Sequence, residues 1–299
     1  MSNTIDVGGR SIEIGNPDKE LFPRDGITKL DFARYVHQVA EVMIPHTRNR
    51  AMTMHRYPDG IESDGFYQKE APDHFPDWIR IERLEKEGGS VNHVVCDDAA
   101  TLVYLADQAC ITPHVTLSTI DRIHHPDRVV FDLDPPEGVD DPEPVKEAAR
   151  SVRDLLDELG LHAFLMTTGS SGYHVVVPLD ASRDFDTVRG IAHRMADELA
   201  ERYPDALTAA QRKDKRKGRV FVDYLRNGYA QTTVAPYSVR ALPGAPVATP
   251  IDWDELGSTD PRHYTMTSVL RRLAQKDDPW SGIGRAAVDA STIDERLGG

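Results

Sequence analysis

Cysteine is scarce in this chain of 299 residues, which contains only Cys96 and Cys110. Two cysteines without a Cys-x-x-Cys spacing exclude a disulfide framework and a four-cysteine zinc site, so we expect buried, reduced thiols. Long apolar runs are also missing, and the N-terminus lacks the basic start and apolar stretch of a signal peptide. We therefore expect a soluble protein of the cytoplasm.

Basic residues are outnumbered, and the net charge is −14 at pH 7. This balance argues against a nonspecific coat for nucleic acid, because binding to phosphates requires neutralisation by Lys and Arg. Any nucleic-acid site must be local, and the segment 211–219, with six basic residues and one acid, is the densest candidate. A solvated loop is the alternative interpretation of such a run. A weaker basic group comes earlier, at Lys19, Arg24, Lys29, Arg48, Arg50 and Arg56.

Internal repeats, low-complexity segments and Ser/Gly linkers are absent, while a hydrophobic content of 39% allows a substantial core. We expect one catalytic domain spanning 1–299, with an N-terminal lobe at about 1–110 and a catalytic α/β lobe at about 111–284. The tail, 285–299, is expected to be loosely structured.

Apolar periodicity divides the chain into helices and strands. Helices are expected at about 28–45, 98–109, 143–159, 186–202 and 266–274. Strands are expected in a hairpin at 4–14 and at 51–57, 65–69, 79–85, 91–96, 128–134, 162–167, 174–178 and 219–224. The alternation in the second half predicts the α/β (α+β mixed) class, with a central mixed sheet flanked by helices.

Three carboxylates stand at strand ends. Asp132 and Asp134 close the apolar strand 128–134 and, two residues apart, leave the same face. Asp223 closes the strand 219–224. Clustered carboxylates are costly unless cations neutralise them, and hard divalent ions that keep positions open for phosphate do so. The pattern therefore predicts a metal-dependent phosphate enzyme.

A dehalogenase-type phosphatase is one alternative, because that fold also begins with a strand followed by Asp-x-Asp. It requires Thr or Val where this chain has Pro136, however, and it places the motif early, whereas here more than 120 residues precede it.

The loop 168–172, Thr-Gly-Ser-Ser-Gly, offers backbone N–H groups and hydroxyls beside His174, which suits phosphate oxygens. An ordinary turn followed by a core histidine is the alternative. His114 is open to the same two interpretations.

Four motifs in order resemble the archaeo-eukaryotic primase superfamily, and within it the polymerase domain of bacterial DNA ligase D. They are Val-Val-Phe-Asp132-Leu-Asp134-Pro, Thr-Gly-Ser-Ser-Gly-Tyr-His174, Val-Phe-Val-Asp223-Tyr and Ala-Pro-Tyr-Ser-Val-Arg240. The resemblance runs from Gly15 to Trp280 and implies a two-lobed primase-polymerase fold. No ligase or nuclease domain accompanies it within the 299 residues, so we expect a stand-alone polymerase.

The resemblance also implies roles for individual residues. Asp132, Asp134 and Asp223 would hold two divalent ions, with Mn²⁺ preferred over Mg²⁺, and act on NTP or dNTP substrates. The positions expected around the nucleotide are His114, Thr168, Ser170, Ser171, His174, Arg216, Arg226 and Arg240. Asn16, Lys19 and Lys29 would bind a DNA 5′-phosphate, and Phe66 and Tyr67 would stack on template bases.

Three positions depart from that family. Thr168 and Ser171 stand where relatives carry Ser and then Lys or Arg, so the loop has one cation fewer. Tyr67 replaces a more usual Phe and should preserve stacking.

The sequence thus predicts a metal-dependent nucleotidyltransferase that fills short gaps or extends broken DNA ends in non-homologous end joining, with a separate ATP-dependent ligase and Ku as partners. A primase-polymerase of gap or excision repair is the nearest alternative. A non-catalytic module that only bridges DNA ends is another.

Overall fold

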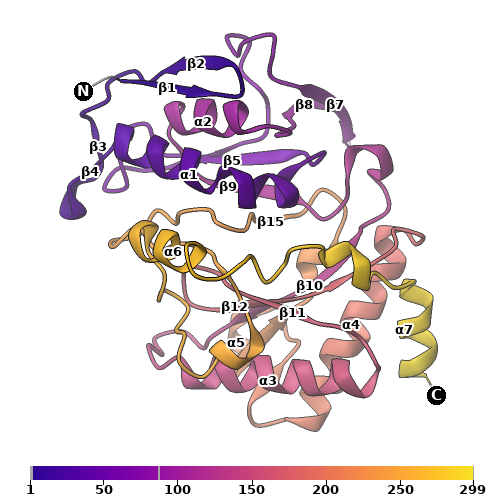
Figure 1. The fold of residues 1–299 in the computed structure, drawn as a ribbon. Coiled ribbons are helices and arrows are strands. Elements are labelled where there is room, and N and C mark those ends of the chain that lie inside the picture. Colours follow the sequence, from indigo (N-terminus) through magenta and orange to yellow (C-terminus); the bar gives the residue numbers. More distant parts are fainter. Residues whose placement is uncertain (1–2, 87, 299) are drawn as a thin grey trace. The chain divides into compact units, whose positions relative to one another are not determined.

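The computed structural model describes residues 3–86 and 88–298. The chain forms two compact units (Figure 1). Unit 1 contains Met1–Thr116, Thr232–Ala248 and Tyr264–Lys276, and unit 2 contains Leu117–Gln231, Thr249–His263 and Asp277–Gly299. The chain therefore returns twice to unit 1, whereas the lobes expected from the sequence were continuous.

Unit 1 combines helices with an antiparallel sheet. Its four strands have the order β15-β9-β5-β6, and their bounds are Thr232–Val234, Cys110–Thr116, Met52–Arg56 and Phe66–Gln68. The hairpins are β1 (Thr4–Val7) with β2 (Arg10–Glu13), β3 (Glu20–Phe22) with β4 (Ile27–Thr28), and β7 (Ile81–Lys86) with β8 (Gly89–Val94). The helices are α1 (Lys29–Thr47), α2 (Ala99–Asp107) and the returning α6 (Met266–Leu273).

Local sequence explains how α1 begins. The Thr28 side chain accepts a hydrogen bond from the backbone of Asp31, whose carboxylate accepts one from the backbone of Thr28. This reciprocal cap satisfies two otherwise unpaired N–H groups. The expected end at Pro45 is wrong, because the helix continues through Pro45 to Thr47.

Unit 2 is built around a six-stranded sheet of order β13-β14-β10-β12-β11-β16. The strands are Leu207–Thr208, Val220–Asp223, Arg128–Asp134, Tyr173–Pro178, Phe164–Thr167 and Pro250–Ile251. Only β13 and β14 pair in parallel, and the other neighbours are antiparallel, so the expected mixed sheet is confirmed. The helices are α3 (Glu143–Glu158), α4 (Phe185–Arg202), α5 (Lys213–Arg216) and α7 (Ala290–Leu297).

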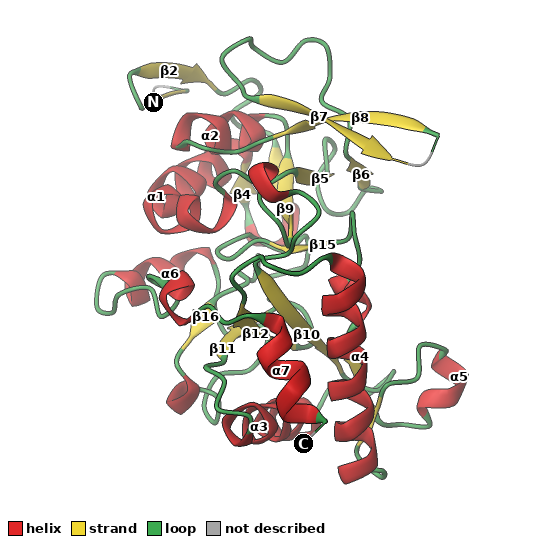
Figure 2. Ribbon diagram, turned by 90° about the vertical axis from the view of Figure 1, so that its right-hand side faces the viewer, coloured by secondary structure: helices red, strands yellow, loops and turns green. Residues whose placement is uncertain are grey.

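The end of the chain is more ordered than the sequence predicted. A short turn of helix, Ile283–Ala286, precedes α7, which lies beside α4 in Figure 2. Asp289 caps α7 by accepting a hydrogen bond from the Ser291 backbone, and Ile293 is buried. The expectation of a loosely structured tail was wrong, because one apolar helix face and one cap are enough to anchor eight residues against a larger helix.

Strand β10 holds the centre of the unit 2 sheet. It is antiparallel to both β12 and β14, and Val129, Val130, Phe131 and Leu133 are at most 1% exposed. Beside Val130, the side chain of the fully buried Asn227 accepts a hydrogen bond from the Val130 N–H at 2.8 Å. It also donates one to the Val130 carbonyl at 2.7 Å. Asn227 thus supplies the bonds of a neighbouring strand at a position where pairing with β14 has stopped.

Within the described residues, no helix combines the length and apolar content needed to cross a bilayer.

Gly172 lets the loop before β12 lie directly on β10. A Cβ atom at this position would be 1.9 Å from the Leu133 carbonyl oxygen, which is part of the strand backbone and cannot swing away. Glycine is therefore required by close backbone approach.

We expect Gly172→Ala to lower the free energy of unfolding by about 1–3 kcal/mol, since the added methyl must push the loop away from β10. Urea unfolding monitored by circular dichroism measures the change. Gly257→Ala is the matched control, because a Cβ atom there would have no neighbouring atom within 4 Å. Equal stability of the two variants would contradict the contact.

Candidate active site

The three carboxylates expected from the sequence meet on the sheet of unit 2. Asp132 and Asp134 lie on β10, and Asp132 is the direct antiparallel partner of Asp223 on β14. The Cα atoms of such partners are about 4.5–5.5 Å apart. On its other side Asp132 is paired with His174 on β12. One row across three strands therefore carries Asp223, Asp132 and His174, with Asp134 two residues further along.

Burial sets the electrostatics of this row. Burial, followed by the charges of Asp132 and Asp223, raises the pKa of Asp134 to about 6, while Arg216 and Arg226 oppose the rise. Burial also raises the pKa of Asp223, against the effect of a hydrogen bond that its Oδ1 accepts from the Leu225 N–H at 2.7 Å. The site thus holds carboxylates in a place that disfavours their charged form.

Two neighbours partly offset the negative charge. The Arg226 Nε lies 3.4 Å from Asp132 Oδ2 and 3.5 Å from Asp223 Oδ2, and its side chain is 42% exposed. The Nε2 of the buried His174 lies 3.4 Å from Asp132 Oδ1. Arg226 therefore bridges two carboxylates from the solvent side.

This donor set fits hard divalent cations. All three side chains offer only carboxylate oxygens, the ligand type that Mg²⁺ and Mn²⁺ accept, and their mutual repulsion favours a bound cation. A second acidic group, Asp252, Asp254 and Glu255, has ligand atoms within 4.8 Å of one another. Asp252 and Glu255 form the capping box of the helical turn Trp253–Glu255, which explains that group structurally.

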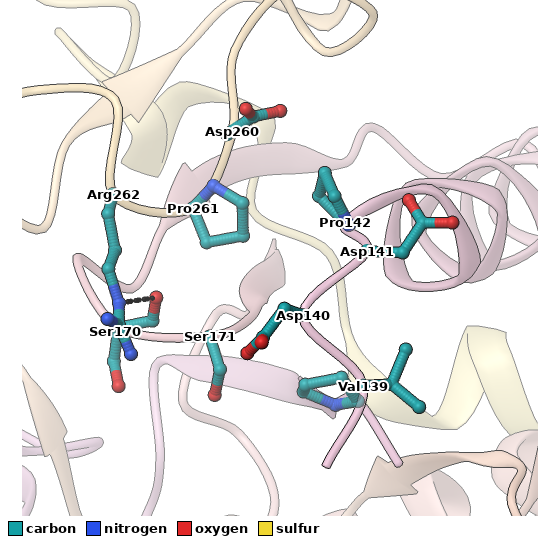
Figure 3. A pocket seen from close by; sticks show the side chains of 10 residues that line it. Val139, Asp140, Asp141, Pro142, Ser170, Ser171, Asp260, Pro261 and Arg262 are labelled. Atoms are coloured by element: carbon teal, nitrogen blue, oxygen red, sulfur yellow. Dashed lines mark hydrogen bonds between the residues drawn. The ribbon is translucent and has the colours of Figure 1, made fainter. Parts of the chain in front are cut away.

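The loop 168–172 is organised by its first side chain. The Thr168 hydroxyl donates to the Gly172 carbonyl at 3.0 Å and accepts from the N–H groups of Ser170 and Gly172, each at 3.2 Å. Ser170 and the exposed Ser171 line a hollow of about 270 Å³ together with Arg262 (Figure 3). The Arg262 Nε donates to the Ser170 carbonyl at 2.9 Å.

The basic segment 211–219 lies beside β14. Its helix α5 ends with Arg216, whose guanidinium carbon lies 3.9 Å from the centre of the Phe221 ring. Phe221 is the register partner of Asp134, so Arg216 is held next to the row of carboxylates. Lys213 forms an ion pair with Glu137, and Arg212 forms one with Asp214.

Unit 1 carries an aromatic group of its own. Phe66 and Tyr67 on β6 are 46% and 62% exposed, and the Tyr67 ring stacks on His55 at 3.9 Å between centroids. His114 on β9 lies 5.6 Å from the Tyr67 ring centre. Burial, together with the positive charge of Arg240, lowers the pKa of His55. Tyr67, His114 and Arg240 therefore lie around His55, which the sequence did not identify. Phe66 faces the other side of β6, where the Arg56 guanidinium lies 5.7 Å from the centre of its ring.

The candidate 5′-phosphate residues also belong to unit 1. Lys29 is mostly buried and pairs with Asp107 at 2.8 Å, and it donates to the Gly15 carbonyl at 2.7 Å. Lys19 is more exposed and pairs with Asp59 at 2.7 Å. Asn16, next to the carbonyl that Lys29 holds, has a positive φ of 51°. Lys29 is thus held by two contacts, while Lys19 is the more exposed of the two lysines.

The raised pKa of Asp134 predicts how stability depends on pH. Because about 6 is above the ordinary value of 3.8, the folded protein binds a proton more readily than the unfolded chain between these values. The contribution of Asp134 to the free energy of unfolding of the metal-free protein therefore decreases as pH rises from about 4 to about 6. In EDTA at pH 7, Asp134→Asn should be more stable than wild type by about 1–3 kcal/mol, and this gain should vanish near pH 4.

Chemical denaturation at the two pH values measures this difference. The exposed Asp277→Asn is the control and should change stability equally at both. A gain for Asp134→Asn that persists unchanged at pH 4 would show that charge burial is not its cause.

Comparison with known proteins identifies the family. Residues 28–280 match the family described as LigD, primase-polymerase domain. The multifunctional non-homologous end joining protein LigD of Mycolicibacterium smegmatis is 35% identical over 269 residues, which are 89% of this chain and 35% of that protein. The bifunctional LigD of Bacillus subtilis is 31% identical over 274 residues, 91% of this chain and 44% of that protein. The chain thus spans less than half the length of these relatives.

A solved structure agrees over the same region. The polymerase domain from Mycobacterium tuberculosis ligase D, in complex with DNA, superposes with a TM-score of 0.85 at 34% identity. The match covers 92% of this chain and 99% of that one, and it confirms the expected fold class. The chain therefore belongs to the LigD primase-polymerase domain family and is a nucleotidyltransferase of the polymerase type.

Proposed function

We propose that this chain extends a DNA primer by one or a few nucleotides at short gaps or broken ends, as part of non-homologous end joining. The observation that carries the proposal is the row of Asp223, Asp132 and His174 across three strands, with Asp134 beside it. A Gly/Ser loop adjoins this row, and two arginines of unit 2 flank it. Carboxylates for metals next to donors for phosphate are the parts that nucleotidyl transfer requires.

Asp132, Asp134 and Asp223 would hold two divalent ions, which supply Lewis-acid stabilisation of the charge that develops on the transferring phosphoryl group. A preference for Mn²⁺ and acceptance of both NTP and dNTP are parts of this proposal. Arg226 is exposed enough to exchange its carboxylate contacts for a phosphate once cations neutralise the row. Arg216 and the N–H groups of loop 168–172 would orient the remaining phosphate oxygens.

Template contacts would come from the aromatic residues of unit 1. Phe66 and Tyr67 expose ring faces on which template bases can stack irrespective of sequence. Because Tyr67 is already stacked on His55, its ring is held in orientation and loses little conformational entropy when a base covers it. The structural relative in complex with DNA supports DNA as a ligand of this chain.

Other residues of unit 1 would contact the nucleotide and the far side of a gap. His114 and Arg240 would approach the incoming nucleotide. Asn16, Lys19 and Lys29 would bind the 5′-phosphate beyond a gap, with Lys29 held in place by Asp107 and the Gly15 carbonyl.

The proposed partners and location rest on the relatives of this chain. The relatives are named as end-joining proteins, which supports a ligase and Ku as partners and the bacterial cytosol as the place of action. A role in gap or excision repair without end joining would use the same chemistry. The dehalogenase-type phosphatase considered from the sequence is overturned by the family match.

Loss of the carboxylates tests the chemistry. Asp134→Ala or Asp223→Ala should lower extension of a labelled primer–template with Mn²⁺ and nucleotides by at least about 100-fold, because the developing charge loses its stabilisation. DNA affinity, measured by fluorescence anisotropy, should change little. Asp254→Ala, in the other acidic group, is the control and should extend normally. Near wild-type extension by Asp223→Ala would refute the two-metal assignment, and a wild-type protein that binds DNA without extending it would support an end-bridging module.

Lys19 tests the proposed 5′-phosphate contact. Lys19→Ala should reduce the preference for a gap with a downstream 5′-phosphate over one with a hydroxyl by about 1–2 kcal/mol, since a charge-assisted contact is lost while the existing pair with Asp59 discounts it. Competition binding measures the preference, with Lys276→Ala as the control. Equal wild-type affinity for the two gaps would exclude the pocket.

A further inference from the structure

We propose that Tyr224 is a positioning residue, which acts through Gln211 and holds Arg216 beside the carboxylates. This inference rests on the proposed function, in which Arg216 would orient a phosphate oxygen of the nucleotide. Neither Tyr224 nor Gln211 was identified as a site residue from the sequence. The inference therefore adds two uncharged side chains to a site that has so far been described by its charges.

The guanidinium group of Arg216 lies beside the carboxylates. Its carbon is 3.9 Å from the centre of the Phe221 ring, and Phe221 is the register partner of Asp134. Burial is the main cause of the raised pKa of Asp134 and of Asp223, and the positive charge of Arg216 opposes the rise at both. Arg216 is thus close enough to act on these carboxylates, and a phosphate held there would experience the same positive charge.

Two backbone carbonyl groups orient this guanidinium. The Arg216 Nε donates to the Ala210 carbonyl and its Nη2 donates to the Gln211 carbonyl, each at 3.3 Å. Both acceptors belong to the chain that enters the basic segment 211–219, so the position of residues 210 and 211 decides where the guanidinium lies. A guanidinium group has more N–H donors than these two bonds use, and the others can bind phosphate oxygens.

Residues 210 and 211 are themselves held by side chains of unit 2. The Ala210 N–H donates to the hydroxyl of Thr208, a buried residue of β13, at 3.1 Å. The Gln211 Nε2 donates to the Tyr224 hydroxyl at 3.0 Å. Gln211 is otherwise an exposed residue, so this bond gives its side chain a fixed position. Thr208 and Tyr224 therefore each hold one of the two residues whose carbonyls orient Arg216.

Tyr224 is a rigid point of attachment. It is only 3% exposed, and its ring stacks on His193 of α4, with the ring centres 4.1 Å apart and the planes 15° from parallel. The segment that it holds includes α5, which lies at the edge of unit 2 in Figure 2. Attachment to a rigid group reduces the conformational entropy that Arg216 loses when it binds a phosphate.

Removal of one partner of the Gln211–Tyr224 hydrogen bond is the sharpest test. Tyr224→Phe removes the hydroxyl and retains the ring that stacks on His193, while Gln211→Leu removes the amide donor. Tyr203→Phe is the matched control, an exposed tyrosine at the end of α4. Each protein is assayed for extension of a saturating primer–template by one nucleotide with ATP and Mn²⁺, and for ATP binding by isothermal titration.

We expect Tyr224→Phe and Gln211→Leu each to raise the KM for ATP about 3- to 5-fold with kcat little changed, because a less ordered Arg216 loses more entropy on binding. ATP affinity should fall by the same factor. The two substitutions together should have no larger effect than either alone, since both remove the same hydrogen bond. Tyr203→Phe should behave as wild type does.

A double-mutant comparison tests whether the effect passes through Arg216. Arg216→Gln should raise the KM for ATP about 10-fold, since a charge-assisted contact is lost. Adding Tyr224→Phe to Arg216→Gln should raise the KM no further, because the side chain that Tyr224 positions is no longer there. A general loss of structure would instead raise the KM in both backgrounds.

Three results would overturn the inference. An unchanged KM in Tyr224→Phe would show that nucleotide binding does not depend on the hydroxyl. A rise of equal size in the Arg216→Gln background would show that the effect does not pass through Arg216. A fall in kcat with a higher requirement for Mn²⁺ would place the effect at the neighbouring Asp223. Failure of the proposed function would look different, because the wild-type protein itself would then neither bind ATP nor extend primers.

Discussion

Repulsion among three partly buried carboxylates is the constraint on which unit 2 depends. Asp132, Asp134 and Asp223 would lower their free energy by moving into water, yet the sheet holds them in one place. The apolar residues of β10 keep the strand in the core, and β12 and β14 pair with it on both sides. Asn227 completes the bonding where β14 ends. Packing elsewhere in the fold thus offsets the unfavourable free energy of burying these carboxylates. Such a balance is common where function requires charged groups in unfavourable positions.

The cations around this site come from separate parts of the chain. Arg226 follows β14 and bridges Asp132 and Asp223, and Arg216 of α5 is held over Phe221. Their position next to the carboxylates offsets part of the negative charge at this place in a protein with a net charge of −14. The surplus of acid elsewhere limits attraction to this region, which favours a local site over nonspecific coating.

Much of the secondary structure of unit 2 could be predicted from the sequence, because the residue patterns that indicate it are local. Residues two apart on a strand share a face whatever surrounds them, so Asp132 and Asp134 were identified together. Apolar periodicity predicted helices α3 and α4. The predicted Gly/Ser loop 168–172 contains Gly172, whose backbone lies close to the Leu133 carbonyl. In unit 1, too, a helix boundary shifted by only a few residues, from the expected Pro45 to Thr47. The prediction of a loosely structured tail was wrong, because helix α7 depends on packing against α4.

Which distant residues meet depends on long-range packing. Sequence periodicity indicates strands and helices but not which of them pair. It could not show that Asp132 pairs with Asp223, or that Asn227 forms hydrogen bonds with β10. Arg262 and Ser170 are 92 positions apart, and no motif connects them. The return of β15 and α6 to unit 1 was hidden for the same reason. The chemistry of the carboxylates and of the loop could be inferred from the sequence, since residue type and strand period are local. The cations that serve them were decided by the fold, because contacts between remote segments arise only when the chain packs.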